Sequence, residues 1–92
     1  MKLKIKPSAR INRRHLLIEA RNRTEIEEAI LEYVGALGWA KAAPVFVEGE
    51  WLGKIVLSID RKEVDNVRGA FEMSNRRIKV IRVSGTLKGL AR

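Results

Sequence analysis

The segment VFVEGEWLGKIVLSI (residues 45–59) decides the fold of this chain. It holds two short apolar runs rich in β-branched residues, at positions 45–48 and 54–59, and Pro44 precedes the first run. Such runs favour strands, and Gly49 with Glu50 between them provides a connecting turn. The segment therefore predicts a β-hairpin near the middle of the sequence.

Helical patterns flank this hairpin on both sides. Upstream, Thr24 with Glu27 three residues later is typical of a helix start, and apolar residues recur at helical spacing as far as Leu37. Gly38 stands where a glycine commonly ends a helix. Downstream, Asp60 and Glu63 repeat the acidic helix start. The apolar stripe of this second helix consists of Val64, Val67, Ala70 and Phe71, before Ser74 and Asn75.

Two further strands complete the pattern. Residues 15–20 form a short apolar run before the first helix, and residues 78–83 are β-branched and alternating after the second. The element order is therefore β-α-β-β-α-β. Right-handed crossovers onto one antiparallel sheet then give a ferredoxin-like α/β (α+β) two-layer sandwich with both helices on one face. In that arrangement the first and fourth strands are neighbours.

The length of 92 residues fits one domain. We expect residues 1–12 to be a flexible basic arm, residues 13–88 to be the ferredoxin-like domain, and residues 89–92 to be a short basic tail. The sequence has no signal-peptide pattern and no run of 18 apolar residues. A cytoplasmic location without membrane contact is therefore expected.

The distribution of charge indicates an anionic partner. The net charge is +8, made up of +7 over residues 1–23, −5 over residues 24–75 and +6 over residues 76–92. Lysine and arginine near phosphates release condensed counterions, which dominates affinity for nucleic acids. Because the first and fourth strands are predicted neighbours, the two basic ends are expected to form one continuous cationic surface.

No group of side chains in the sequence indicates catalysis. The single histidine, His15, stands at a strand start with no recognisable nucleophile or orienting partner. The glutamates of segment 25–28 lie in a first helical turn, where carboxylates stabilise the helix dipole, and so predict no metal site. The chain has no cysteine, which excludes disulfides and thiolate zinc sites. We therefore expect no catalytic residue and no metal or cofactor bound by the protein.

The aromatic side chains argue against one common mode of RNA binding. RNA recognition motifs stack bases on aromatic residues of their central strands, and the predicted first and third strands contain no Phe, Tyr or Trp. Contact with the RNA backbone is therefore expected. Trp39 and Trp51 flank the second strand; packing on the core is their simpler role, but exposed tryptophans suit a protein contact. With Tyr33 and Leu37 they form the candidate partner interface.

Four segments resemble ribonuclease P protein component 2, a subunit shared by archaea and eukaryotes. They are RRHL (13–16), GALGWAKAAP (35–44), GKIVLSIDRKE (53–63) and VSGTLK (83–88), in colinear order over residues 13–88. The last, which closes the fourth strand, is the most specific. Without the resemblance, Gly85 would be explained as a turn residue, and Ser84 and Thr86 as hydrogen-bonding partners of the local backbone.

The resemblance implies a ferredoxin-like, non-catalytic subunit of an endoribonuclease that removes the 5′ leader from precursor tRNA. In that enzyme the RNA subunit and its Mg²⁺ ions perform the hydrolysis. The implied partners are ribonuclease P RNA, precursor tRNA and protein component 3, with a homodimer inside a heterotetramer as a further option. The residues expected to contact phosphates are Arg13, Arg14, Arg61, Arg76, Arg77, Lys79, Arg82 and Lys88.

The sequence departs from the family pattern at three places. Ile59-Asp60-Arg61 stands where members usually have Arg-x-Arg, so Arg61 alone carries over. His15 replaces the usual aromatic residue, and the chain ends four residues after Lys88, without the helical extension of many relatives.

Two other functions remain open. One is another structured-RNA-binding protein of the same fold, ribosomal or tRNA-binding. The other is a small acylphosphatase-like enzyme, which requires an arginine-bearing phosphate loop and an asparagine that positions water. The segment RNRT (21–24) contains these residue types.

Overall fold

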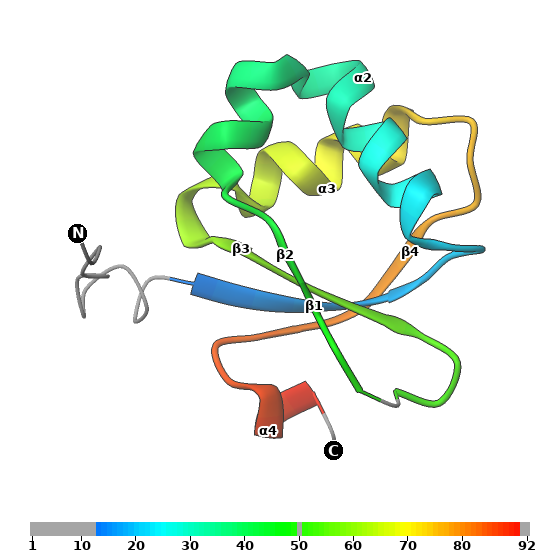
Figure 1. Ribbon diagram of the computed structural model, residues 1–92, viewed down its shortest axis with the longest axis vertical. Coiled ribbons are helices and arrows are strands. Elements are labelled where there is room, and N and C mark those ends of the chain that lie inside the picture. The colour runs from blue at the N-terminus through cyan, green and yellow to red at the C-terminus, as the bar shows by residue number, and fades with distance from the viewer. Residues whose placement is uncertain (1–12, 50, 91–92) are drawn as a thin grey trace, which may run out of the picture.

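The predicted order of elements is confirmed in the computed structural model, which describes residues 13–49 and 51–90 (Figure 1). The fold is α+β with ferredoxin-like topology. Its strands are β1 (Arg13–Glu19), β2 (Val45–Val47), β3 (Ile55–Asp60) and β4 (Lys79–Ser84). Its helices are α2 (Arg23–Ala42), α3 (Val64–Met73) and the short α4 (Leu87–Leu90), with a 3-10 turn, η1, at Arg61–Glu63.

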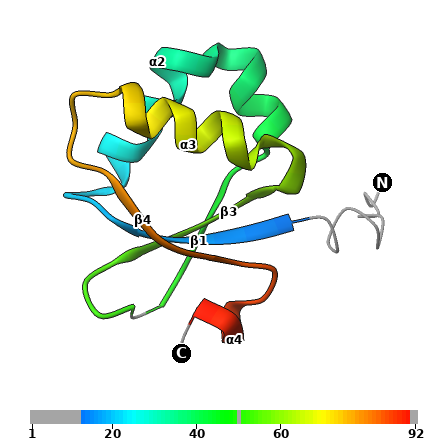
Figure 2. The same ribbon diagram turned by 180° about the vertical axis from the view of Figure 1, so that it is seen from behind.

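The four strands form one antiparallel sheet in the order β2-β3-β1-β4. The prediction that the first and fourth strands are neighbours is therefore confirmed. Helices α2 and α3 pack together over one face of the sheet, and α4 lies on the opposite face (Figures 1 and 2). The first face is thus covered by the two long helices. The second, which we call the open face, carries α4, and its β3 residues Val56 and Ser58 are buried.

Alternation along the central strands separates the two faces. Leu16 and Ile18 of β1 and Leu57 and Ile59 of β3 are fully buried, and they pack in one cluster with residues of α2 and α3. Their sequence neighbours point to the open face, because successive strand residues alternate sides. The helical members of the cluster include Ile26, Ile30, Val67 and Phe71.

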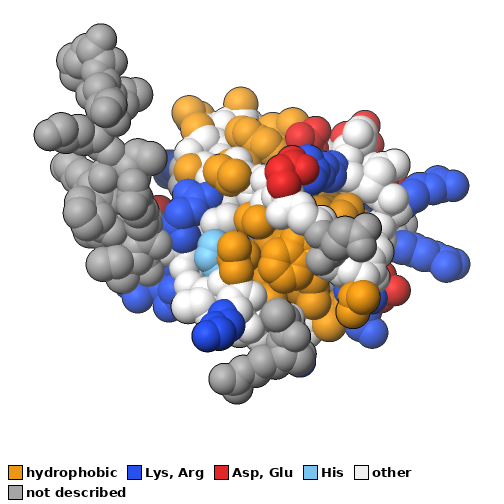
Figure 3. Space-filling view, turned by 60° about the horizontal axis from the view of Figure 1, so that its bottom comes forward, with side chains coloured by type: hydrophobic (Ala, Val, Ile, Leu, Met, Phe, Trp, Pro, Cys, Tyr) orange, Lys and Arg blue, Asp and Glu red, His pale blue; other side chains and the backbone are white. Residues whose placement is uncertain are grey.

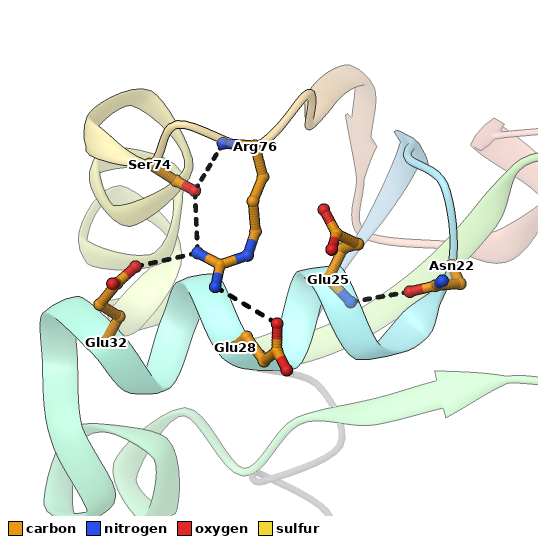
Figure 4. Close-up of polar contacts among 6 residues, drawn as sticks. All are labelled: Asn22, Glu25, Glu28, Glu32, Ser74 and Arg76. Atoms are coloured by element: carbon orange, nitrogen blue, oxygen red, sulfur yellow. Dashed lines mark hydrogen bonds and ion pairs between the residues drawn. The ribbon is translucent and has the colours of Figure 1, made fainter.

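The N-cap of helix α2 lies two residues earlier than the sequence predicted. The N-cap is Asn22, whose side-chain oxygen accepts a hydrogen bond from the backbone N–H of Glu25 at 2.9 Å (Figure 4). The predicted capping box of Thr24 and Glu27 was wrong, because Thr24 already lies inside the helix. Asn22 has the extended backbone that an N-cap requires, and its short side chain reaches the first free amides.

The end of α2 also differs from the prediction. Gly38 was expected to end the helix, but α2 runs to Ala42, and Ala43 adopts the left-handed conformation of a C-cap. The break lies instead at Gly35, whose φ of 72° interrupts the helix and redirects its last turns. Gly38 serves a packing role, since a Cβ there would lie 2.5 Å from Cβ of Val34.

The second helix starts through a short turn. The Asp60 carboxylate accepts a hydrogen bond from the backbone N–H of Lys62 at 2.9 Å and so caps η1. Helix α3 then follows from Val64. The sequence signal of an acid before this helix is thus confirmed, with a 3-10 turn inserted.

The C-terminal part of the chain folds further than expected. Residues 89–92 were predicted to be a tail, but α4 includes Gly89 and Leu90, and Leu90 is buried. The predicted arm, residues 1–12, lies outside the described residues, as do residues 91–92. Among the residues that the structure describes, no helix is long and apolar enough to cross a membrane.

Candidate nucleic-acid interface

Four of the eight predicted phosphate contacts lie toward one end of the sheet, and a fifth, Arg82, stands at mid-strand opposite Leu17 and donates to the backbone oxygen of Gly89 in α4. The antiparallel register places His15 opposite Ser84 and Arg13 opposite Asp60, so the start of β1 adjoins the ends of β3 and β4. The segments that follow β3 and β4 carry Arg61 and Lys88. We call this group the β1-start cluster; its members are Arg13, Arg14, Arg61, Arg82 and Lys88.

Arg13 is held by the protein itself. Its Nε donates to Ser58 Oγ at 2.9 Å, and its Nη2 donates to the backbone oxygens of Ser58 at 2.6 Å and Ala43 at 2.5 Å. Burial lowers the pKa of the Arg13 guanidinium, and the Asp60 carboxylate partly offsets this effect. Arg13 therefore ties β1 to β3 and to the end of α2, which leaves fewer of its donors for a phosphate.

The turn after β4 is ordered by its own hydroxyl groups. The backbone N–H of Thr86 donates to Ser84 Oγ, and that of Gly89 donates to Thr86 Oγ1, each at 3.1 Å. The interpretation of Ser84 and Thr86 as partners of the local backbone is thus confirmed. Arg14 lies beside this turn, since a Cβ on Gly85 would be 3.5 Å from its Nη1. The turn therefore brings Arg14 and Lys88 to the same end of the sheet.

The remaining three predicted contacts lie at the opposite end. Arg76 and Arg77 precede β4, and Lys79 pairs with Glu19 at the far end of β1. Six residues separate Arg13 from Glu19 along β1, which corresponds to about 20 Å at 3.3 Å per residue. Strands β1 and β4 are therefore adjacent, as predicted, but the basic side chains at the start of β1 and those at the start of β4 lie at opposite ends of this strand pair.

Arg76 is engaged by acidic side chains. Its Nη1 donates to Glu32 at 2.9 Å and its Nη2 donates to Glu28 at 3.2 Å, while Ser74 Oγ accepts from its backbone N–H (Figure 4). Hydrogen bonding to Glu32 is the main reason why the pKa of Arg76 is raised. These bonds attach the α3–β4 connection to α2, so Arg76 acts first as a structural residue.

Mixed charges surround Arg77 and Lys79. Both line an open groove between the start of α2, the end of α3 and the start of β4, where Arg21 adds a further cation. Carboxylates line the same groove, namely Glu19, Glu25, Glu32 and Glu72. The expected continuous cationic surface is therefore divided into the β1-start cluster and this mixed-charge groove.

His15 has a place that the sequence did not reveal. It lies on the open face between Ser58 and Ser84, its direct neighbours on β3 and β4. Its Nδ1 is buried and has no hydrogen-bond partner in the described part of the chain. Burial, followed by the positive charges of Arg13 and Arg14, lowers the pKa of His15. The imidazole is therefore neutral at neutral pH.

The candidate partner residues fall into two groups. Leu37 is 80% exposed and Tyr33 is 42% exposed, and the Tyr33 hydroxyl donates to the backbone oxygen of Met73 at 2.6 Å. Trp39, in contrast, is half-buried and packs against the core cluster. Trp51 is also half-buried, with a buried Nε1 that has no partner among the described residues. Tyr33 and Met73 thus lie side by side and exposed on the helical layer, and Leu37 is exposed on the last turns of α2, after the break at Gly35.

The segment that suggested a phosphatase has other contacts. Asn22 caps α2, and the guanidinium of Arg23 pairs with Glu48 at 3.2 Å while lying 5.2 Å from the centre of the Phe46 ring. Within residues 13–49 and 51–90, no group of three or more His, Asp or Glu side chains is placed to hold a metal ion.

No protein-family model and no curated protein matches this sequence.

Proposed function

We propose that this protein is a non-catalytic, RNA-binding subunit of ribonuclease P, which supports the catalytic RNA as it removes the 5′ leader from precursor tRNA. The observation that carries the proposal is the β1-start cluster, which collects five cations from β1, β4, α4 and η1. It lies beside the turn of the VSGTLK segment (83–88), the most specific part of the resemblance. We propose that the protein performs this role in the cytoplasm.

The proposed division of labour assigns the chemistry to the RNA. Mg²⁺ ions held by the RNA activate the attacking water and stabilise the leaving oxygen. The protein neutralises phosphates and so reduces the repulsion that opposes RNA folding. Three members of the cluster, Arg61, Arg82 and Lys88, are exposed and available for this task.

Protein component 3 is the proposed protein partner, and the exposed apolar residues Leu37, Tyr33 and Met73 of the helical layer are its proposed contacts. These three side chains are among the large apolar residues with the greatest exposure on the helical layer. They lie on the layer of α2 and α3, away from the open face of the sheet, so both partners could bind at once. Association of two copies within a heterotetramer is compatible with this arrangement.

Reconstitution tests the proposal. Ribonuclease P RNA and component 3 are combined with or without this protein, and precursor tRNA cleavage is measured at moderate Mg²⁺. We expect the protein to lower the Mg²⁺ concentration required for cleavage, because it replaces part of the cationic screening. Equal cleavage with and without the protein would refute the assignment. Ribosomal RNA, rather than one structured RNA, co-purifying with the protein would favour the ribosomal alternative.

The salt dependence of RNA binding locates the contact surface. If Arg14, Arg61, Arg82 and Lys88 each neutralise one phosphate, the slope of log K against log salt is about −2.8 to −3.6. Arg82→Gln and Lys88→Gln should each reduce the slope by about 0.7–0.9. Arg68→Gln, an exposed charge on α3, is the matched control and should leave the slope unchanged. Equal effects of all three variants would show that the cluster is not the contact surface.

A further inference from the structure

On the open face of the sheet, the row of side chains that contains His15 crosses all four strands. Val45, Ser58, His15 and Ser84 are direct cross-strand neighbours, in that order, from β2 to β4. The serines on either side are small, so the imidazole is the largest side chain at the centre of this row. Cross-strand neighbours on one face lie about 4.5–5.5 Å apart, so the row is continuous.

Apolar and cationic side chains lie on either side of His15. Leu17 is the next residue of β1 on the same face and remains half-buried, and Arg82 stands opposite it on β4. Arg13 precedes His15 on this face. Helix α4 contacts β4 and β1 from the same side and brings Lys88 there. Figure 3 shows this face, with hydrophobic side chains at its centre and lysine or arginine side chains near the histidine.

The state of the histidine ring suits a planar, uncharged ligand group. A neutral imidazole presents an aromatic face without charge, and its two nitrogens offer one donor and one acceptor. Burial and the charges of Arg13 and Arg14 keep His15 neutral. One carboxylate near this group belongs to Asp60, which lies opposite Arg13. Further positive charge comes from Arg82 on β4 and Lys88 on α4. A nucleobase is the planar group that histidine stacks on in RNA complexes.

The exposed basic side chains near His15 indicate which class of partner binds this face. Arg82 is exposed, and within the described residues its guanidinium makes one hydrogen bond, from Nη1 to the backbone oxygen of Gly89, which is long at 3.4 Å. Lys88 is also exposed. A phosphate would form shorter, charge-assisted bonds with either side chain. An apolar peptide on the same face would leave these charges without a partner, so a nucleotide fits better than a protein segment.

We propose that the open sheet face binds one unpaired nucleotide of an RNA, with its base on His15 and Leu17 and its phosphate on Arg82 and Lys88. This inference deepens the proposed function and rests on it, because it names the kind of RNA element that this face recognises. It adds base stacking to the expected contact with the RNA backbone, because histidine can stack on bases as Phe, Tyr and Trp do. The base is then read by one aromatic side chain, and the strand is held by two cations.

The test uses the full chain and two probes of equal charge: a penta-adenylate RNA and an abasic ribose-phosphate oligomer of the same length. Stacking of one base contributes about 1–3 kcal/mol, so His15→Ala should weaken penta-adenylate binding by about 5- to 140-fold. His15→Phe should restore it, since phenylalanine also stacks. Neither variant should change binding of the abasic oligomer. The single histidine gives one set of ring signals in NMR, and these should shift with penta-adenylate and much less with the abasic probe.

The outcomes separate this site from the proposed function. Unchanged penta-adenylate affinity in His15→Ala, absent ring shifts at saturation, or no binding of penta-adenylate would each overturn the nucleotide site. The reconstitution experiment is independent of these results, because the β1-start cluster can contact a folded RNA without a stacked base. Loss of binding to both probes in His15→Ala and His15→Phe alike would indicate a damaged surface, which also contradicts the proposal.

Discussion

The docking of α4 provides a prediction whose magnitude follows from the structure. Leu90 is 3% exposed although it lies in a helix of four residues, too short to be stable on its own. Ordering four residues costs about 1–2 kcal/mol each. The opposing contributions are burial of one leucine, about 2–3 kcal/mol, and a few hydrogen bonds of about 1 kcal/mol each. The ordering cost and these contributions are of similar size, so the net free energy of docking α4 is small.

Leu90→Ala removes three carbon atoms from this contact, worth about 2.4 kcal/mol at about 0.8 kcal/mol each. Because the net free energy of docking is small, we expect α4 to detach while the rest of the domain stays folded. The free energy of unfolding, measured with urea, should fall by about 1–2 kcal/mol, limited by the net docking energy. Hydrogen exchange at the Gly89 amide should accelerate, since its bond to Thr86 Oγ1 is lost.

Two further variants make this test specific. Leu87 is 38% exposed, so Leu87→Ala should cost less than about 0.5 kcal/mol. Gly89→Ala should detach α4 by another route, because the added Cβ would lie 2.1 Å from Ser84 Oγ. If Leu90→Ala and Leu87→Ala have equal stability, or if Gly89 exchange does not change, the reasoning about α4 is incorrect.

Three other predictions concern stability. Asn22→Ala should lower the free energy of unfolding by about 1 kcal/mol through loss of the helix cap, whereas Thr24→Ala should change it little; equal losses in urea titrations would contradict the assigned cap. Gly69→Ala in α3 should raise the same free energy by about 0.5–1 kcal/mol, because nothing lies within 4 Å of the added Cβ, and a loss of stability would show a hidden clash. His15 has a lowered pKa in the folded protein, so the unfolded chain binds more protons below its ordinary pKa of about 6.5. Stability should therefore fall as pH drops through that value and level off below the folded pKa, and the step should vanish in His15→Gln when melting is followed between pH 8 and 4.

Local patterns in the sequence were sufficient for the elements and their order. Strands and helices follow from the periodicity of apolar residues, and the crossover rule then selects the sheet order. The leucines and isoleucines of β1 and β3 were recognisable as core residues for the same reason. Helix ends were less predictable: Asn22 and Thr24 are both good caps, and the choice depends on the backbone path out of β1.

The grouping of charges required the tertiary structure. The sequence identified two basic ends, and strand adjacency was predicted correctly, yet antiparallel register places Arg13 and Lys79 at opposite ends of the same pair of strands. Nothing local in the sequence showed that Arg76 would pair with Glu28 and Glu32, which lie more than 40 residues away.

The sequence by itself therefore determined the class of fold, the content of the core and the excess of positive charge, because these depend on residue type and short-range spacing. The tertiary structure alone decided which cations are exposed, which are bound by the protein, and that His15 lies at the centre of the open face. These features depend on register and on contacts between distant segments, and such contacts form only when the chain is folded.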